Sequence, residues 1–214
     1  MTGEISTFTW PHIGDAPEVA GVYAWYVRMF LGEADLRAFE KEVNETRAAD
    51  RSTTAIVEDM LERHFFHPFQ ENPYSIRLSG PLKPRYTGEL AHEPTKSEDL
   101  IRRLGEQPER LRSIARVLHR AAPNFTAPLY IGMASNLRSR LQQHKKLIMH
   151  FSDNRGATLG EDGVSGFARQ VVSRGFNPTS LFVACIPIED IENDEQIDLE
   201  NILNRINFPI FGRN

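Results

Sequence analysis

The sequence predicts a mixed α/β (α+β) fold in which a small three-stranded sheet, mixed or antiparallel, is flanked by helices. Three short runs are rich in β-branched and aromatic residues, which favour strands, and they lie at residues 19–30, 129–133 and 181–188. Stretches of helix-forming residues separate and follow these runs. The 214 residues suffice for one core with an appended subdomain.

The first half of the chain predicts helices after the first strand. Helix-forming residues predict one helix at residues 34–49 and another at residues 53–65. Several prolines and glycines within residues 71–94 predict loops or a hairpin. Residues 97–122 predict two further helical pieces, which Pro123 and Pro128 are expected to end. The segment between the first two strands is therefore mostly helical.

The second half alternates strands with helices. A helix is expected directly after the second strand, because Leu137, Leu141 and Ile148 recur at helical spacing. Either Ser135 or Asn136 can cap its free amides. The remaining segments are predicted as a loop, a turn of helix and a final helix, at residues 152–166, 167–174 and 194–206.

The composition argues against several classes of protein. With 40% hydrophobic and 25% charged residues and no long apolar run, the chain is expected to be globular and not to enter a membrane. Residues 1–8 contain Glu4 and lack the basic start and apolar stretch of a secretory signal, so we expect a cytoplasmic protein. The single cysteine, Cys185, excludes a disulfide framework and a cysteine-based zinc site.

Basic residues are concentrated in one region, although the net charge is −4. Residues 101–146 contain ten basic residues against two acidic ones, Glu106 and Glu109. Because Lys and Arg dominate binding to phosphates, this block predicts a DNA-binding surface, with a merely solvated helix face as the alternative. The candidate DNA contacts are Arg102, Arg103, Arg110, Arg112, Arg116, Arg120, Arg138, Lys145 and Lys146.

Two short motifs lie on the first two expected strands. Gly21-Val22-Tyr23 on the first strand and Tyr130-Ile131-Gly132 on the second resemble the paired motifs of the GIY-YIG endonucleases. In that family a catalytic arginine, and often a histidine one turn later, follow on the next helix. Arg140 and His144 occupy the corresponding places in this chain. The resemblance covers residues 19–30 and 127–214.

The resemblance implies metal-dependent hydrolysis of phosphodiesters. Glu200 and Asn214 correspond to the family's metal-binding glutamate on the last helix and to its final asparagine. Glu200 would hold Mg²⁺ or Mn²⁺, which are hard cations that prefer carboxylate and water. Arg140 would bind the scissile phosphate through its planar guanidinium. Tyr23 would act as general base, and Tyr130 would orient the water or the phosphate.

His144 lies on the apolar stripe of its helix, between Leu141 and Ile148, so it is expected to face the sheet. One turn after Arg140, it can reach the same phosphate or share the proton of the attacking water. A histidine satisfied within the core is the alternative. The other site residues have structural alternatives. The two tyrosines could pack in the core, and Arg140 could be a solvated helix residue. Glu200 could be an acidic residue that favours the start of its helix, and Asn214 could belong to a frayed terminus.

The two motifs lie roughly a hundred residues apart, whereas a short loop separates them in the family. We therefore expect a catalytic core at residues 1–30 and 127–214 that is split by an inserted, mostly helical subdomain at residues 31–126. A chance Gly-Val-Tyr is the alternative. The insertion is expected to supply DNA contacts, with Lys83, Arg85 and Tyr86 near base edges.

Together these features predict a divalent-metal-dependent DNA endonuclease, most similar in its setting to restriction or phage-defence nucleases. A homodimer is one way for such an enzyme to cut both strands. A non-catalytic DNA-binding or partner-binding protein that keeps the same scaffold is the first alternative. A globular protein with coincidental motifs is the second, and in that protein the two motif tyrosines would lie far apart.

Overall fold

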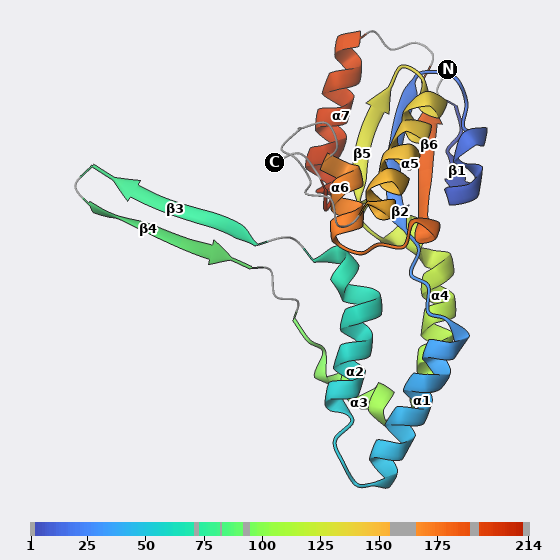
Figure 1. The fold of residues 1–214 in the computed structure, drawn as a ribbon, viewed down its shortest axis with the longest axis vertical. Coiled ribbons are helices and arrows are strands. Elements are labelled where there is room, and N and C mark those ends of the chain that lie inside the picture. The colour runs from blue at the N-terminus through green and yellow to red at the C-terminus, as the bar shows by residue number, and fades with distance from the viewer. Residues whose placement is uncertain are drawn as a thin grey trace. The chain divides into compact units, whose positions relative to one another are not determined.

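A computed structural model of the chain describes residues 3–70, 73–81, 83–91, 95–154, 166–188 and 193–211. Two compact units make up the chain (Figure 1). Unit 1 consists of Met1–Phe30 and Arg116–Asn214, and unit 2 consists of Leu31–Ala115. Helix α4 (Arg110–Phe125) contributes residues to both units. Within the described ranges, every helix is too short or too polar to span a bilayer.

Unit 1 is built on an antiparallel sheet of four strands in the order β1-β6-β2-β5. The strands are β1 (Ser6–Thr9), β2 (Gly21–Val27), β5 (Tyr130–Ala134) and β6 (Leu181–Pro187). The three expected strands are confirmed, but the expected number of strands is wrong by one. In β1 only Phe8 is apolar, so this edge strand has no hydrophobic pattern and joins β6 through its backbone.

The register of the strands places the motif residues on one face of the sheet. Tyr23 lies opposite Gly132, and Trp25 lies opposite Tyr130. Directly paired residues share a face, and side chains alternate between faces along a strand. Tyr23 and Tyr130 are therefore diagonal neighbours on the same face.

Helices α5 (Leu137–Asp153) and α6 (Gly166–Ser173) cover this face (Figure 1). The ring of Phe167 in α6 lies 5.4 Å from the ring of Trp25 in β2. The two helices also pack against each other. The motif tyrosines are thus enclosed between the sheet and two helices.

Helix α7 (Asn193–Asn207) packs against the opposite face of the sheet. Its side chains Leu199 and Leu203 contact a small core around Val22 and Ile131. The final helix expected at residues 194–206 is confirmed. Because α7 also contacts β5 at the edge of the sheet, residues on its flank can approach the motif face.

The start of α5 and the end of α4 can be compared with the ends predicted from the sequence. The side chain of Asn136 accepts a hydrogen bond from the backbone amide of Ser139 at 2.9 Å, so Asn136, not Ser135, caps α5. Such a cap contributes about 1 kcal/mol. Helix α4 ends at Phe125, between the two prolines expected to end it, so it runs three residues beyond the predicted last residue, Ala122. Proline removes one amide donor, and only two helical residues follow it here, so little of the helix is disturbed.

The loop expected at residues 152–166 is shorter at its start, because α5 continues to Asp153. Residues 155–165 lie outside the described residues. The turn of helix expected at residues 167–174 is confirmed as the eight-residue helix α6.

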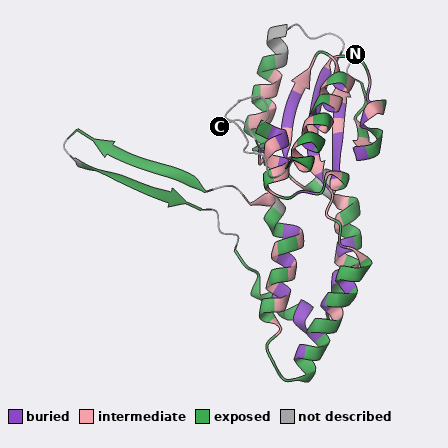
Figure 2. Cartoon of the chain, viewed as in Figure 1, coloured by how far each residue is buried: buried purple, intermediate pink, exposed green. Residues whose placement is uncertain are grey.

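Unit 2 contains the helices expected between the first two strands, and their apolar sides form its core (Figure 2). The helices are α1 (Glu33–Ala48), α2 (Thr54–Leu61), α3 (Glu98–Glu106) and the first turns of α4. Helix α2 continues as a wider π-helical turn at Glu62–Phe66 and a 3₁₀ turn at His67–Phe69. The core side chains include Leu36, Phe39, Val43, Val57, Leu61, Phe65, Ile101, Leu104 and Leu111.

A two-stranded antiparallel hairpin, β3 (Tyr74–Gly80) and β4 (Lys83–Leu90), lies between α2 and α3 in the chain. Of the two structures expected for residues 71–94, loops or a hairpin, the hairpin is confirmed. Every residue of β3 is exposed, and so is each β4 residue whose side chain the structure describes (Figure 2).

Candidate active site

Tyr23 and His144 are joined by a buried hydrogen bond. The Tyr23 hydroxyl lies 2.9 Å from His144 Nε2, and the two residues are 1% and 6% exposed. Tyr23 comes from β2, and His144 belongs to the buried stripe of α5 together with Leu141 and Ile148. The prediction that His144 faces the sheet is confirmed.

Tyr130 and neighbouring rings surround this hydrogen bond. The Tyr130 ring lies 6.2 Å from the Tyr23 ring and 5.8 Å from the His144 ring. Phe167 and Trp25 lie 5.3 Å and 6.2 Å from the imidazole, again between ring centres. The two motif tyrosines therefore lie side by side, and packed rings shield the Tyr23–His144 pair from water.

The motif glycines are required because other groups occupy the space of a side chain. A Cβ at Gly132 would lie 2.6 Å from the Tyr23 hydroxyl oxygen and 2.9 Å from Cε1 of Tyr130. A Cβ at Gly21 would collide with the backbone carbonyl oxygen of Ile186. Real Cβ atoms do not approach other atoms this closely. Gly132 thus sets how near the Tyr23 hydroxyl lies to β5.

Arg140 brings a positive charge to the same hydroxyl groups. Its half-buried guanidinium interacts with Tyr23 and Tyr130 through its charge, and its Nη1 donates to Gln143 Oε1 at 2.7 Å. The tautomer of His144 decides which group donates in its hydrogen bond with the Tyr23 hydroxyl. Arg140, Tyr23 and His144 thus form one cluster in which a positive charge acts on a hydrogen-bonded pair.

Burial keeps both members of the Tyr23–His144 pair neutral. Desolvation, together with the charge of Arg140, lowers the pKa of His144 from 6.5 to about 3. Desolvation, aided by Tyr130, raises the pKa of Tyr23 well above its ordinary value even though Arg140 acts in the opposite direction. At neutral pH the imidazole is therefore uncharged, and the tyrosine keeps its proton.

The neutral state of His144 should make the stability of the protein depend on pH. An unfolded histidine takes up a proton below about pH 6.5, whereas the folded protein does not protonate His144 until about pH 3. The contribution of His144 to stability is therefore complete above pH 6.5 and is lost as the pH falls towards 3. From this group alone, we expect the free energy of unfolding in urea to fall by about 2 kcal/mol between pH 7 and pH 5.

His144→Gln is the control for this prediction, because glutamine does not titrate. Carboxylates contribute equally to both proteins, so the difference between the two pH profiles isolates His144. Identical pH profiles for the two proteins would contradict the lowered pKa.

Glu200 of α7 acts on the same cluster through its negative charge. Its charge is one of the influences that raise the pKa of Tyr23. Glu200 is half-buried, and its carboxylate has no hydrogen bond or ion pair with another described residue, while its backbone carbonyl accepts from Asn204. No cluster of three or more His, Cys, Asp or Glu side chains that could hold a metal is found in the described part of the chain. Asn214 lies outside the described residues.

In unit 2 the arginines expected to bind DNA contact other side chains of the protein. Arg112 forms ion pairs with Glu33 and Glu40 of α1. The count of acidic residues within positions 101–146 omits such distant partners, and so it overstates the positive charge of this helix surface. Three further arginines, Arg102, Arg103 and Arg110, bond to side chains within one helical turn, namely Asp99, Glu106 and Gln107.

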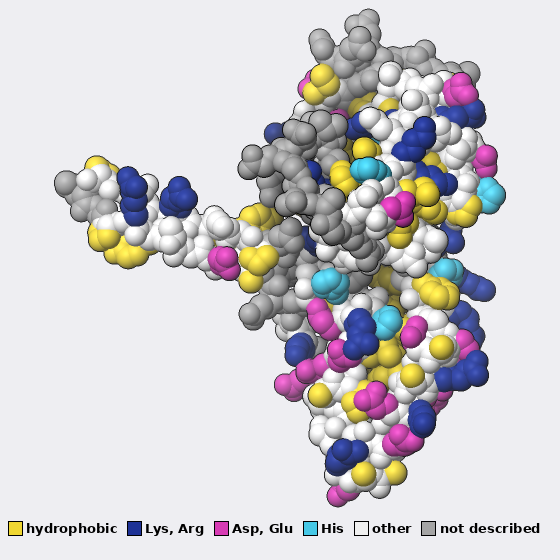
Figure 3. Space-filling model, in the orientation of Figure 1, with side chains coloured by type: hydrophobic (Ala, Val, Ile, Leu, Met, Phe, Trp, Pro, Cys, Tyr) yellow, Lys and Arg dark blue, Asp and Glu magenta, His cyan; other side chains and the backbone are white. Residues whose placement is uncertain are grey.

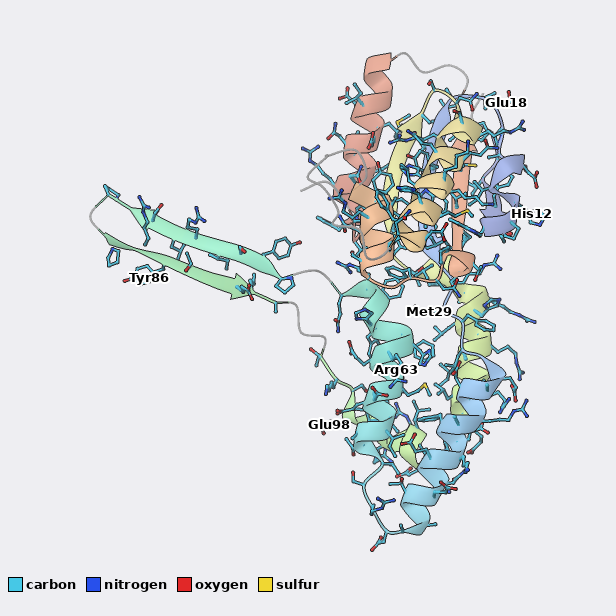
Figure 4. The ribbon with its side chains drawn as sticks, viewed as in Figure 1. His12, Glu18, Met29, Arg63, Tyr86 and Glu98 are labelled. Atoms are coloured by element: carbon cyan, nitrogen blue, oxygen red, sulfur yellow. The ribbon has the colours of Figure 1, made fainter. Side chains whose placement is uncertain are left out.

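In unit 1 two basic residues of the same block hold the N-terminal segment. Arg138 donates to the Ala16 carbonyl at 2.7 Å and pairs with Glu18, which is labelled in Figure 4. Lys145 donates to the Trp10 carbonyl at 2.8 Å and lies over the Trp10 ring. The remaining candidates are exposed and have no hydrogen bond or ion pair with another described residue: Arg116, Arg120 and Lys146.

Three residues of the site were not predicted from the sequence. Trp25 and Phe167 pack against the His144 ring, and Gln143 bonds to Arg140. Gln143 could have been found, because it lies three residues after the expected catalytic arginine and so on the same side of the helix. Nothing in the local sequence distinguishes Trp25 or Phe167 from ordinary core residues.

Comparison with known proteins does not identify a relative. No protein-family model, curated protein or solved structure matches the chain. The function is therefore inferred from the geometry and chemistry of the site itself.

Proposed function

We propose that this chain is a divalent-metal-dependent DNA endonuclease with a GIY-YIG-type core, of the restriction or phage-defence kind and acting in the cytoplasm. One observation carries the proposal. Four side chains from separate parts of the sequence lie together in unit 1: Tyr23, Tyr130, Arg140 and His144. Glu200, from a fourth element, is electrostatically coupled to the same tyrosine. Coincidental motifs would not be expected to converge in this way.

The contacts suggest a role for each side chain. Hydrolysis of a phosphodiester needs an acceptor for the proton of water and positive charge beside the phosphate. Arg140 supplies that charge, with Tyr130 beside it to orient the phosphate or the water. Tyr23 accepts the proton from water as it passes its own proton to Nε2 of His144.

The bound substrate assists this proton transfer. Burial and, to a smaller extent, the positive charge of Arg140 lower the pKa of His144 and make it a weak acceptor. A phosphate held by Arg140 would offset the second of these effects and raise the basicity of His144. The proton relay would therefore work best when DNA is bound, which is the order that a nuclease requires.

The donor chemistry beside the tyrosines fits Mg²⁺ or Mn²⁺. Glu200 would hold the ion with a half-buried carboxylate that has no partner among the described residues. Magnesium commonly binds through one or two carboxylates and keeps several waters, so a larger set of protein ligands is not needed. When bound, the ion would supply positive charge for the phosphate and the leaving oxygen.

A non-catalytic DNA-binding or partner-binding protein that keeps this scaffold is the second candidate. The observation in its favour is the burial of Tyr23, which is only 1% exposed and must become accessible to water before it can act as a base. A binding protein would not depend on the charge of Glu200 or on a metal ion.

We expect the protein to cut supercoiled plasmid and phage DNA in Mg²⁺ or Mn²⁺ and to leave both intact in chelator. Glu200→Gln should lower cleavage about 100-fold or more, because the amide loses the charge that holds the cation. Agarose electrophoresis of the products measures both effects.

Asp198→Asn is the matched control, because Asp198 is an exposed carboxylate on the same helix. This variant should cleave like the unaltered protein. DNA binding without cleavage under every metal condition would favour the second candidate over the nuclease.

A further inference from the structure

The hairpin β3–β4 differs in charge from the rest of unit 2. Between Tyr74 and Leu90 there are three basic residues, Arg77, Lys83 and Arg85, and one acidic residue, Glu89. The remainder of unit 2 has fifteen acidic residues against ten basic ones. The hairpin is therefore a positively charged segment within an acidic unit.

The register of the hairpin separates its two faces. Opposed pairs such as Leu78 with Tyr86 and Tyr74 with Leu90 place large apolar side chains on one face. Arg77 lies opposite Thr87 on the other face, and Arg85 falls on the same side because it precedes Tyr86 by one residue. Figure 3 shows basic side chains on the upper side of the hairpin, and hydrophobic ones on its lower side and near its two ends.

The arginines of the hairpin can bind a ligand more readily than the arginines on the helices of unit 2. Arg77 and Arg85 are exposed and form no hydrogen bond or ion pair with another described residue. Arg102 and Arg112, on the helices of the same unit, are held by acidic neighbours. A phosphate can bind the hairpin arginines without first breaking an ion pair.

We propose that the hairpin is a DNA-binding arm, whose polar face lies in a groove of duplex DNA and contacts it through Arg77 and Arg85. The major groove of duplex DNA admits a two-stranded ribbon of this width. Arg77 and Arg85 contact phosphates and base edges, and these contacts hold the duplex while unit 1 cuts it. This inference rests on the proposed function for the identity of the partner.

A second copy of the chain is the competing occupant, because the other face exposes Leu78 and Tyr86 by 62% and 58% (Figure 4). A strand of eight residues is about 26 Å long, and a ribbon of two strands covers roughly 250 Å² on one face. A stable interface buries about 800 Å² on each partner. The apolar face alone is too small to hold a dimer, whereas the charge of the hairpin complements DNA.

The test measures binding apart from cleavage. Fluorescence anisotropy of a labelled 25-base-pair duplex (about two helical turns) is recorded in chelator over a range of salt concentrations. Arg77→Ala with Arg85→Ala should weaken binding about 10-fold or more and reduce the slope of log Kd against log salt by about 2. The control pair, Arg37→Ala with Arg51→Ala, removes the same charge from exposed arginines elsewhere in unit 2 and should leave both quantities unchanged.

The outcomes separate this inference from the proposed function. Unchanged affinity and slope in the hairpin variant, with plasmid cleavage intact, would overturn the arm and leave the nuclease standing. Binding that depends on the hairpin without cleavage by any preparation would support the arm and overturn the nuclease. Unchanged DNA binding, together with a dimer that Leu78→Ser and Tyr86→Ser convert to a monomer in sedimentation, would assign the hairpin to a second copy and overturn the arm.

Discussion

Replacing Arg140 with alanine is expected to lower DNA cleavage roughly 1000-fold while leaving the fold intact. The guanidinium is half-buried beside Tyr23 and Tyr130 and bonded to Gln143, so its charge already lies beside the tyrosines when a phosphate arrives. Fixed donors of this kind act more strongly in a site shielded from water than in bulk solvent. Single-turnover cleavage with enzyme in excess would separate the chemical step from DNA binding.

Arg140→Lys is the matched variant, because lysine keeps the charge but lacks the planar guanidinium. We expect it to recover only a small part of the lost rate. Removing Arg140 also removes a charge that lowers the pKa of His144, so NMR titration should show that pKa rising in Arg140→Ala. Cleavage by Arg140→Ala within about 10-fold of the unaltered protein would contradict the assigned role.

Gly132→Ala should both destabilise unit 1 and remove most of the cleavage activity. The added methyl group would lie 2.6 Å from the Tyr23 hydroxyl oxygen and 2.7 Å from Cζ of the same ring. The ring cannot withdraw freely, because Tyr23 is buried and hydrogen-bonded to His144. Overpacking of this kind costs about 1–3 kcal/mol, and the displaced hydroxyl would lose its alignment with His144.

The control is Gly88→Ala, which adds the same methyl group to a strand where no atom lies within 4 Å of the new Cβ. Its free energy of unfolding should change by less than about 0.5 kcal/mol. Urea titrations of the two variants measure the difference. Equal stability in both variants would mean that the surroundings of Gly132 adapt to a methyl group, contrary to the prediction.

Much of the fold of unit 1 is predictable because its signals are local. The run of β-branched and aromatic residues in β2 and the helical spacing of Leu141, His144 and Ile148 each depend on fewer than a dozen neighbouring residues. β1 could not be predicted in this way, because it is stabilised by backbone pairing with β6 and carries no pattern of its own.

The candidate site, like the fold, is only partly predictable from local sequence. The motifs indicate which polar side chains belong together, and the structure places Tyr23, Tyr130, Arg140 and His144 at one point. The electrostatics could not be obtained from sequence, because the raised pKa of Tyr23 depends on burial by rings from distant segments. The pairing of Arg112 with acidic residues of α1 was likewise hidden by its separation along the chain.

The position of the insertion also determines when the sheet can form during synthesis. Strand β2 pairs with β5 and β6, and the Tyr23–His144 hydrogen bond joins residues 121 positions apart. At about 5–20 residues per second, the ribosome needs roughly 5–20 s to deliver the intervening chain. During that interval both edges of β2 lack a partner strand, whereas all residues of unit 2 (Leu31–Ala115) are present before β5 is synthesised. Under the proposed function, nuclease activity can therefore arise only after β5, β6 and Glu200 of α7 have been synthesised, and pairing over such distances is slow.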